Sequence, residues 1–250
     1  MAPTTLAKRK AGGLVDNFKT IIYAILIALA IRTVAFEPFN IPSGSMIPTL
    51  LVGDYLFVSK FSYGYSHYSL PLSPPLFSGR ILASLPKRGD VAVFKLPRDT
   101  STDYIKRLIG LPGDTIQMKD GQLYINGTVV ERTADGTFAA EGEGPPIVEK
   151  RYIETLPGGR EHPILKMSDH EPLDNTEEFH VPPGYVFAMG DNRDNSLDSR
   201  VPNAVGYVPL ENLVGRAEFI FFSIDATHPW YEFWEWPFEI RWGRLFSGIS

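Results

Sequence analysis

The feature that most constrains this chain is an uncharged apolar run near its N-terminus. Residues 20–31 read TIIYAILIALAI, and the run continues past Arg32 to Phe36. A helix that spans a bilayer needs about 20 mostly apolar residues, and about 17 is the short end of the range. Because the run is apolar on all faces, it does not fit a helix buried along one side of a soluble core. The sequence therefore predicts one transmembrane anchor over residues 18–36.

The charges beside this run predict its orientation. The chain has a net charge of −5, but its first 19 residues are basic and include Lys8, Arg9 and Lys10. Basic residues stay on the cytoplasmic side, so residues 1–17 should be cytoplasmic and the body exported. We expect a single-pass protein of the inner (plasma) membrane, with its body on the periplasmic or extracytoplasmic side. A cleaved secretory signal is the alternative, because Ala28-Leu29-Ala30 has the form of a cleavage site.

Composition narrows the fold and the function classes of the body. Hydrophobic residues make up 44% of the chain, enough for a sizeable core, and its 22 Gly and 21 Pro indicate many turns. The absence of Cys excludes thiol proteases, disulfide frameworks and Cys-based metal sites. The acidic body is a poor electrostatic match for nucleic acid, so no nucleic-acid partner is expected. The many turns that Gly and Pro indicate predict a mainly β fold.

Strand and turn patterns divide the body. We expect an antiparallel β-sheet core from residues 37–116 and 184–223, with residues 117–183 inserted as a β-rich subdomain. A turn at Asn126-Gly127 indicates hairpins within 115–130, and residues 62–88 read as a long loop. The predicted strands of the core are 56–58, 91–94, 104–109, 185–189 and 217–223.

The C-terminal segment, residues 224–250, is rich in aromatic residues. All four tryptophans of the chain lie there, at positions 230, 234, 236 and 242. Tryptophan mixed with charged residues is typical of a membrane–water interface, but aromatic residues also favour strand edges. Both interpretations stay open at this point.

Three segments of the body carry groups suited to nucleophilic catalysis. In residues 41–50, IPSGSMIPTL, rigid turns present serine hydroxyls. In residues 103–114, strand alternation sends Lys106 and Arg107 to opposite faces, so one of these cations must meet apolar surroundings. A buried lysine loses its charge and can take a proton from a serine, whereas an arginine cannot. Residues 190–200, GDNRDNSLDSR, form a polar loop whose side chains can hold the serine and the lysine in position.

Common alternatives to this chemistry fail on spacing. The five histidines show no HExxH or comparable metal pattern, so neither a metal nor another cofactor is expected. Ser84 and Lys87 have the Ser-x-x-Lys spacing, but Pro86 between them disfavours the helix that this motif needs. The polar loop from Asp194 lacks the glycine and the glutamate of a calcium loop.

The segments together resemble type I signal peptidase, the bacterial leader peptidase with a Ser/Lys dyad. The resemblance rests on five stretches in this order behind the predicted anchor, 41–54, 88–97, 104–114, 190–200 and 206–209. It implies that Ser45 is the nucleophile and Lys106 the general base, and that Ser43 joins the Ser45 amide in the oxyanion hole. It also implies that Ser196 holds Lys106 and that Asp198 pairs with Arg200; Arg107 is a further supporting cation.

The resemblance further implies the substrate and the partners. Signal peptides of exported preproteins would be cut after small residues at −1 and −3, close to the lipid bilayer. The implied walls of the two apolar subsites are Ile41, Pro42, Met46, Leu50, Tyr104 and Ile105 for −1, and Phe39, Leu56 and Val93 for −3. Two alternatives remain: a catalytically silent exported peptide-binding β-domain, which would leave Lys106 charged and exposed, and a Ser/Lys self-cleaving regulator, which would need a DNA-binding helix-turn-helix.

Overall fold

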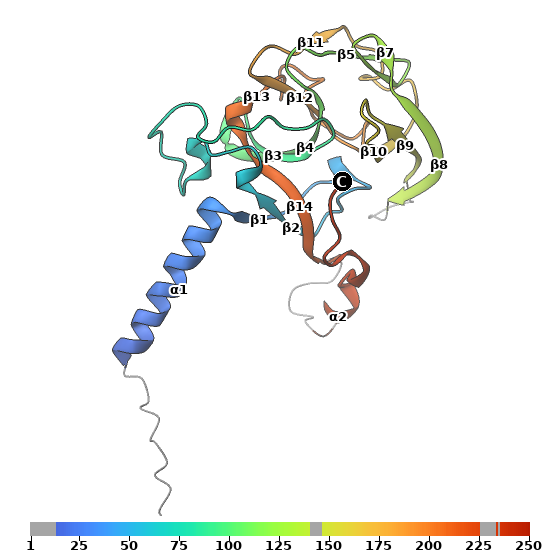
Figure 1. Ribbon diagram of the computed structural model, residues 1–250. Coiled ribbons are helices and arrows are strands. Elements are labelled where there is room, and N and C mark those ends of the chain that lie inside the picture. Colours follow the sequence, from blue (N-terminus) through green and yellow to red (C-terminus); the bar gives the residue numbers. More distant parts are fainter. Residues whose placement is uncertain (1–13, 141–146, 226–233, 235) are drawn as a thin grey trace, which may run out of the picture.

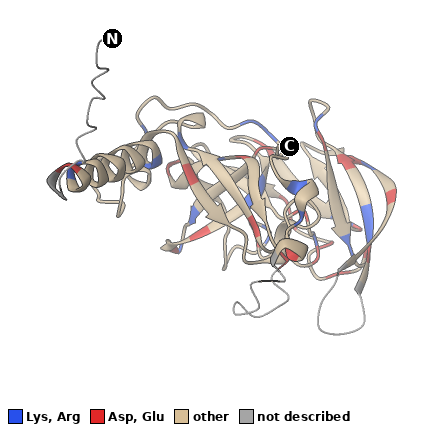
Figure 2. Cartoon of the chain, turned by 90° about the horizontal axis from the view of Figure 1, so that it is seen from below, with Lys and Arg blue, Asp and Glu red and all other residues tan. Residues whose placement is uncertain are grey.

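A long helix projects from a β-rich body in the computed structural model (Figure 1). The structure describes residues 14–140, 147–225, 234 and 236–250. Helix α1 (Leu14–Val34) holds a 19-residue span, Asp16–Val34, that is long and apolar enough to cross a membrane and has no buried residue. In Figure 2 the helix is mostly uncharged, whereas charged residues are frequent on the body. Lys8, Arg9 and Lys10 lie outside the described residues.

Helix α1 ends at Val34, whereas the predicted membrane span runs to Phe36. Phe36 already belongs to β1 (Phe36–Asn40), where it pairs with Ser59 of β2 (Asp54–Ser59). Two contacts close the helix: Tyr65 donates a hydrogen bond to the Val34 carbonyl (2.7 Å), and the Lys60 amide donates to the Ala35 carbonyl (2.9 Å). Because pairing in the sheet satisfies the backbone groups after Ala35, the chain leaves the helix there.

The body is built on a seven-stranded antiparallel sheet, which confirms the predicted mainly β fold. Its order is β1-β2-β14-β3-β4-β12-β13, and register shifts interrupt several of the pairings. Its remaining strands are β3 (Val91–Leu96), β4 (Asp99–Gly110), β12 (Tyr185–Met189), β13 (Val208–Pro209) and β14 (Leu213–Ser223). The buried side chains that pack on it are aliphatic and aromatic, and form contiguous clusters.

Two smaller sheets come from the chain between β4 and β12. One has the order β11-β5-β6-β7 and the other β10-β9-β8. Their strands are β5 (Thr115–Lys119), β6 (Gln122–Ile125), β7 (Thr128–Val129), β8 (Glu131–Ala140), β9 (Ile147–Thr155), β10 (Glu161–Lys166) and β11 (Phe179–His180). Asn126 and Gly127, both at positive φ, form the turn between β6 and β7 as predicted. Apart from single turns of 3-10 helix and one β-bridge, residues 62–88 are a loop.

The aromatic tail returns to the sheet but leaves its rings exposed. It contains the short helix α2 (Trp236–Glu239), and Gly248 and Ile240 form bridges with Phe219 and Ile224. Its exposed rings belong to Trp234, Phe238, Trp242 and Phe246, with exposed fractions of 57% to 85%. This exposure fits the interfacial interpretation better than a buried strand edge. Trp230 lies outside the described residues.

Candidate active site

A hydroxyl and an amine meet in a groove on the seven-stranded sheet. Ser45 lies in a single turn of 3-10 helix (Gly44–Met46), and Lys106 lies on β4. The Lys106 Nζ is 2.6 Å from the Ser45 Oγ although the residues are 61 positions apart. The same amine donates to the Ile105 carbonyl at 3.1 Å. A serine and a possible base are therefore within proton-transfer distance.

The environment of Lys106 favours its neutral form. The residue is 3% exposed, and its amine lies 5.4 Å from the centre of the Tyr104 ring, two residues earlier on the same strand face. Burial lowers the pKa of Lys106 to about 8, although Asp198 and Asp191 act to raise it. An ordinary lysine titrates near 10.4, so this site holds far more free amine at neutral pH. The silent-domain alternative requires an exposed Lys106, which the structure does not have.

Two carboxylates lie nearer to Lys106 than the sequence suggested. An uncharged surrounding is expected from its neighbours along the strand, but the 190–200 loop brings Asp191 and Asp198 close. Each carboxylate is held by an arginine: Arg200 binds Asp198 at 2.9 and 2.8 Å, and Arg107 binds Asp191 at 2.8 and 2.7 Å. Because each pair is nearly neutral, its effect on the lysine is weaker than that of a free carboxylate.

The 190–200 loop fixes the backbone that carries Ser45. The backbone N–H of Asn192 donates to the Ser45 carbonyl at 3.1 Å. Asp191 accepts a 2.5 Å hydrogen bond from the hydroxyl of Thr49, which lies on the same segment as Ser45. Gly190 allows this close approach, because a Cβ there would lie 2.5 Å from the Ser45 carbonyl oxygen and 2.2 Å from the Ser196 Oγ. Only glycine fits without a shift of the loop.

The expected hydrogen bond between Ser196 and Lys106 is not made in the structure. Ser196 is 8% exposed and lines the same groove, but its hydroxyl has no hydrogen bond to Lys106 among the described residues. The amine of Lys106 donates its second hydrogen bond to the Ile105 carbonyl instead. Ser43 is exposed on extended backbone at the groove, one residue before the turn that carries Ser45.

The predicted substrate-binding residues separate into two sets. Six of them line a groove of about 770 Å³ with the Ser45–Lys106 pair: Phe39, Ile41, Pro42, Val93, Tyr104 and Ile105. The other three, Met46, Leu50 and Leu56, do not line it. Their side chains are fully buried in an apolar cluster that also includes Ile41 and Val93 of the groove. They support the walls instead of forming them.

A buried ionic network that no sequence pattern predicts joins the inserted strands to the 190–200 loop. Arg193 pairs with Glu154 of β9 at 2.9 and 2.5 Å, and His162 of β10 lies 3.3 Å from the same carboxylate. Burial raises the pKa of the Glu154 carboxyl, but Arg193 and His162 lower it more, so the pKa lies below its usual range. Burial lowers the pKa of His162. Leu165 also exchanges backbone hydrogen bonds with the loop.

Nothing in the described residues suggests a metal centre or a DNA-binding module. No group of three or more His, Asp or Glu side chains there is arranged to hold a metal ion. The helices longer than one turn of 3-10 helix are α1 and the four-residue α2, so the described chain contains no helix-turn-helix. The self-cleaving regulator alternative has no support from the described residues.

Comparison with known proteins points to one family. The family model "Signal peptidase, peptidase S26" matches residues 14–222. Signal peptidase I of Rickettsia typhi is 48% identical over 225 residues, which cover 87% of this chain and 83% of that protein. Signal peptidase I of Rickettsia conorii is 49% identical over 218 residues, covering 84% and 79%. A solved signal peptidase I from Enterococcus faecalis is 26% identical, with a TM-score of 0.31, and covers 53% of this chain and 97% of that chain.

Proposed function

Because this chain belongs to the signal peptidase family, peptidase S26, and is a serine endopeptidase that cleaves signal peptides, we propose that Ser45 and Lys106 are its catalytic pair. The observation that carries this proposal is the 2.6 Å contact between the Ser45 hydroxyl and a buried amine of lowered pKa. The neutral amine takes the hydroxyl proton as the Ser45 oxygen attacks the carbonyl carbon of the −1 residue.

The remaining steps use the same groups. The negative oxygen of the tetrahedral intermediate accepts hydrogen bonds from the Ser43 hydroxyl and the Ser45 amide. The Lys106 ammonium then gives its proton to the departing amine, which leaves the signal peptide esterified to Ser45. A water molecule, deprotonated by Lys106, attacks the ester and releases the peptide acid. We propose that the Ser196 hydroxyl, which lines the same groove but makes no hydrogen bond to Lys106 in the structure, accepts one from the ammonium during the reaction. Arg107, Asp198 and Arg200 hold the loop that carries Ser196.

Cleavage of a model preprotein tests the function. The purified full chain in detergent should cut a leader with Ala at −1 and −3 immediately after the −1 residue. Phe at −1 should lower kcat/KM about 100-fold, or about 2.7 kcal/mol, because we propose that Ile41 and Ile105, which line the groove beside Ser45, form a subsite for small side chains that a ring would overpack. Sequencing the N-terminus of the product gives the cut position. Equal cutting of the Ala and Phe leaders contradicts the assignment of these walls.

We also propose the membrane topology. Signal peptidase I is a membrane-anchored family, and α1 supplies the apolar helix. The basic residues before α1 place the N-terminus in the cytoplasm, so β1 and the groove emerge on the extracytoplasmic side of the inner membrane. The exposed rings of Trp234 and Trp242 suit contact with the lipid headgroups.

Protease protection tests this topology. Protease added outside cells whose outer barrier has been opened should digest the body and leave a fragment that contains α1 and the N-terminus. A cytoplasmic protein serves as the control for an intact inner membrane. Digestion of the body only after the inner membrane is broken contradicts the proposed orientation.

A further inference from the structure

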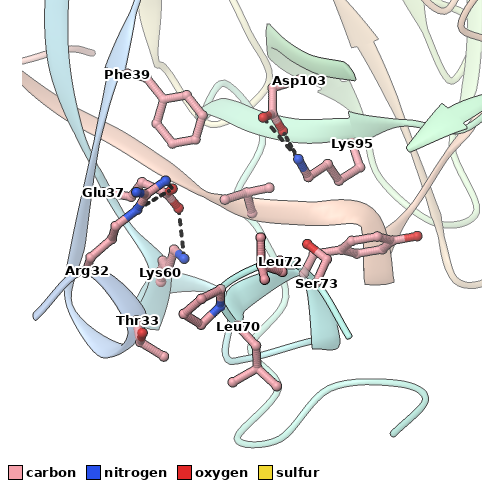
Figure 3. Close-up of a pocket in the computed structure, with 13 residues that line it drawn as sticks. Arg32, Thr33, Glu37, Phe39, Lys60, Leu70, Leu72, Ser73, Lys95 and Asp103 are labelled. Carbon is pink, nitrogen blue, oxygen red and sulfur yellow. Dashed lines mark hydrogen bonds and ion pairs between the residues drawn. The ribbon is translucent and has the colours of Figure 1, made fainter. Parts of the chain in front are cut away.

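A second cavity continues the catalytic groove toward the end of α1. It encloses about 200 Å³, and Phe39 and Asp103 line both the groove and this cavity. Its other walls come from the end of α1, from β1, β3 and β14, from Lys60 just after β2, and from Tyr68 and residues 70–73 of the long loop. Figure 3 shows the charged side chains around it, with Arg32 and Lys60 both directed at Glu37, and Lys95 directed at Asp103.

We propose that this cavity binds the side chains of the signal peptide at positions −5 to −7 and prefers an acidic side chain there. The inference rests on the proposed function, because it takes Ser45 as the point of cleavage. It adds a charged subsite upstream of the apolar −1 and −3 subsites.

The strand directions set the positions that reach the cavity. Neighbouring strands of the sheet are antiparallel, so β1 and β4, which are four places apart in its order, run in the same direction. Both strands run from the cavity toward Ser45. Asp103 precedes Lys106 by three residues, or about 10 Å of strand. Phe39 of β1 lines the groove and the cavity together with Asp103, and Glu37 precedes Phe39 by a further two residues, or about 7 Å. An extended peptide with −1 at Ser45 therefore has −4 beside Asp103 and about −6 beside Glu37.

The membrane end of the signal peptide favours the same path. Its hydrophobic segment lies in the bilayer, as α1 does, and its cleavage site must reach Ser45. The cavity lies between the last turn of α1, which supplies Arg32 and Thr33, and the groove. Residues upstream of −3 therefore pass over this cavity before they enter the apolar subsites.

The charges of the walls select the ligand. Three cations, Arg32, Lys60 and Lys95, face two carboxylates, Glu37 and Asp103, so the walls carry one excess positive charge. Lys60 is buried and shares Glu37 with Arg32, at 2.8 and 2.6 Å, while the Arg32 side chain is 62% exposed and open to a further partner. An acidic side chain completes this set, and a basic one is repelled. The two walls shared with the groove favour a peptide over a lipid headgroup as the occupant.

Three leaders that differ only at −6 test the proposal. Each has Ala at −1 and −3, and position −6 is Glu, Gln or Lys. The full chain in nonionic detergent should cut them in the order Glu, Gln, Lys, with about a tenfold range in kcat/KM, or about 1.4 kcal/mol. The range should reside in KM and shrink at high salt, because the interaction is an ion pair near the surface.

Variants of the wall give the matched comparison. Lys95→Gln removes one cation and should reduce the range to about threefold. Arg98→Gln removes an exposed cation whose neighbours are Pro202 and Asn203, outside both cavities, and should keep it tenfold.

Three results overturn the inference. They are equal cutting of the three leaders, a range that Lys95→Gln leaves unchanged, and a range that appears only when anionic phospholipid is added, which would assign the cavity to lipid headgroups. Failure to cut any leader would instead count against the proposed function.

Discussion

Ser45→Ala is expected to lower kcat for signal-peptide cleavage by at least about 10⁴-fold, or about 5.4 kcal/mol. The hydroxyl that forms the acyl bond is lost, and the remaining groups of the groove can only bind and polarise the substrate. KM should change little, because the Ser45 Oγ contacts the Lys106 amine and does not form an apolar wall. Initial rates on a leader with Ala at −1 and −3 measure this effect.

The fold should survive this substitution. The Ser45 side chain is half-buried and its hydroxyl has the Lys106 amine as partner, which keeps its bond to the Ile105 carbonyl in the variant. We expect the free energy of unfolding to change by less than about 1 kcal/mol. Ser247→Ala, another half-buried serine far along the chain, is the control and should retain full activity. A folded Ser45→Ala chain that cleaves at the normal rate would exclude Ser45 as the nucleophile.

Features set by local sequence were predictable. The alternation along β4 correctly sends Lys106 and Arg107 to different partners, Ser45 and Asp191. The apolar helix follows from a run without charges, and the β6–β7 turn follows from Asn126 and Gly127, which tolerate positive φ. In each case the physical cause lies within a few residues of its effect, so the sequence contains it.

Features set by packing between distant segments were not predictable. Nothing in the sequence around Glu154 or His162 indicates a partner, and only the fold brings them to Arg193 of the 190–200 loop. Met46 and Leu50 lie beside Ser45 in sequence, which suggested subsite walls, but the turn sends them into the core. Proximity in sequence thus identified the segment that brings Ser45 to the groove, but not which of its other side chains line that groove.

The pKa of Lys106 depends on residues that are distant in the sequence and come close only in the fold. Burial is the largest effect on its pKa, and the nearby Asp198 and Asp191 oppose it. Each carboxylate is fully buried and is held by its own arginine, at a distance suited to charge-assisted hydrogen bonds. The site therefore combines two buried ion pairs with an amine whose pKa of about 8 lies well below that of an ordinary lysine.

The pH dependence of kcat/KM should report this amine. A general base must be unprotonated, so activity should rise with pH through an apparent pKa of about 8 and then level off. At pH 6 the rate should be about 100-fold below the plateau, since each unit below the pKa lowers the neutral fraction about tenfold. A profile that is flat between pH 6 and 9 contradicts Lys106 as the titrating base.

Lys106→Met and Lys106→Arg are both expected to lower kcat by about 10⁴-fold, for different reasons. Methionine fills the same space without a base, while arginine keeps the positive charge but cannot release its proton at any pH of the assay. Lys119→Met, an exposed lysine over the Tyr124 ring, is the control and should stay fully active. If Lys106 acted only as a fixed cation, Lys106→Arg would retain much of the activity, so a substantially active arginine variant would reject the proton-transfer role. Loss of activity in both variants, with normal folding by circular dichroism, is the result that a free amine beside Ser45 requires.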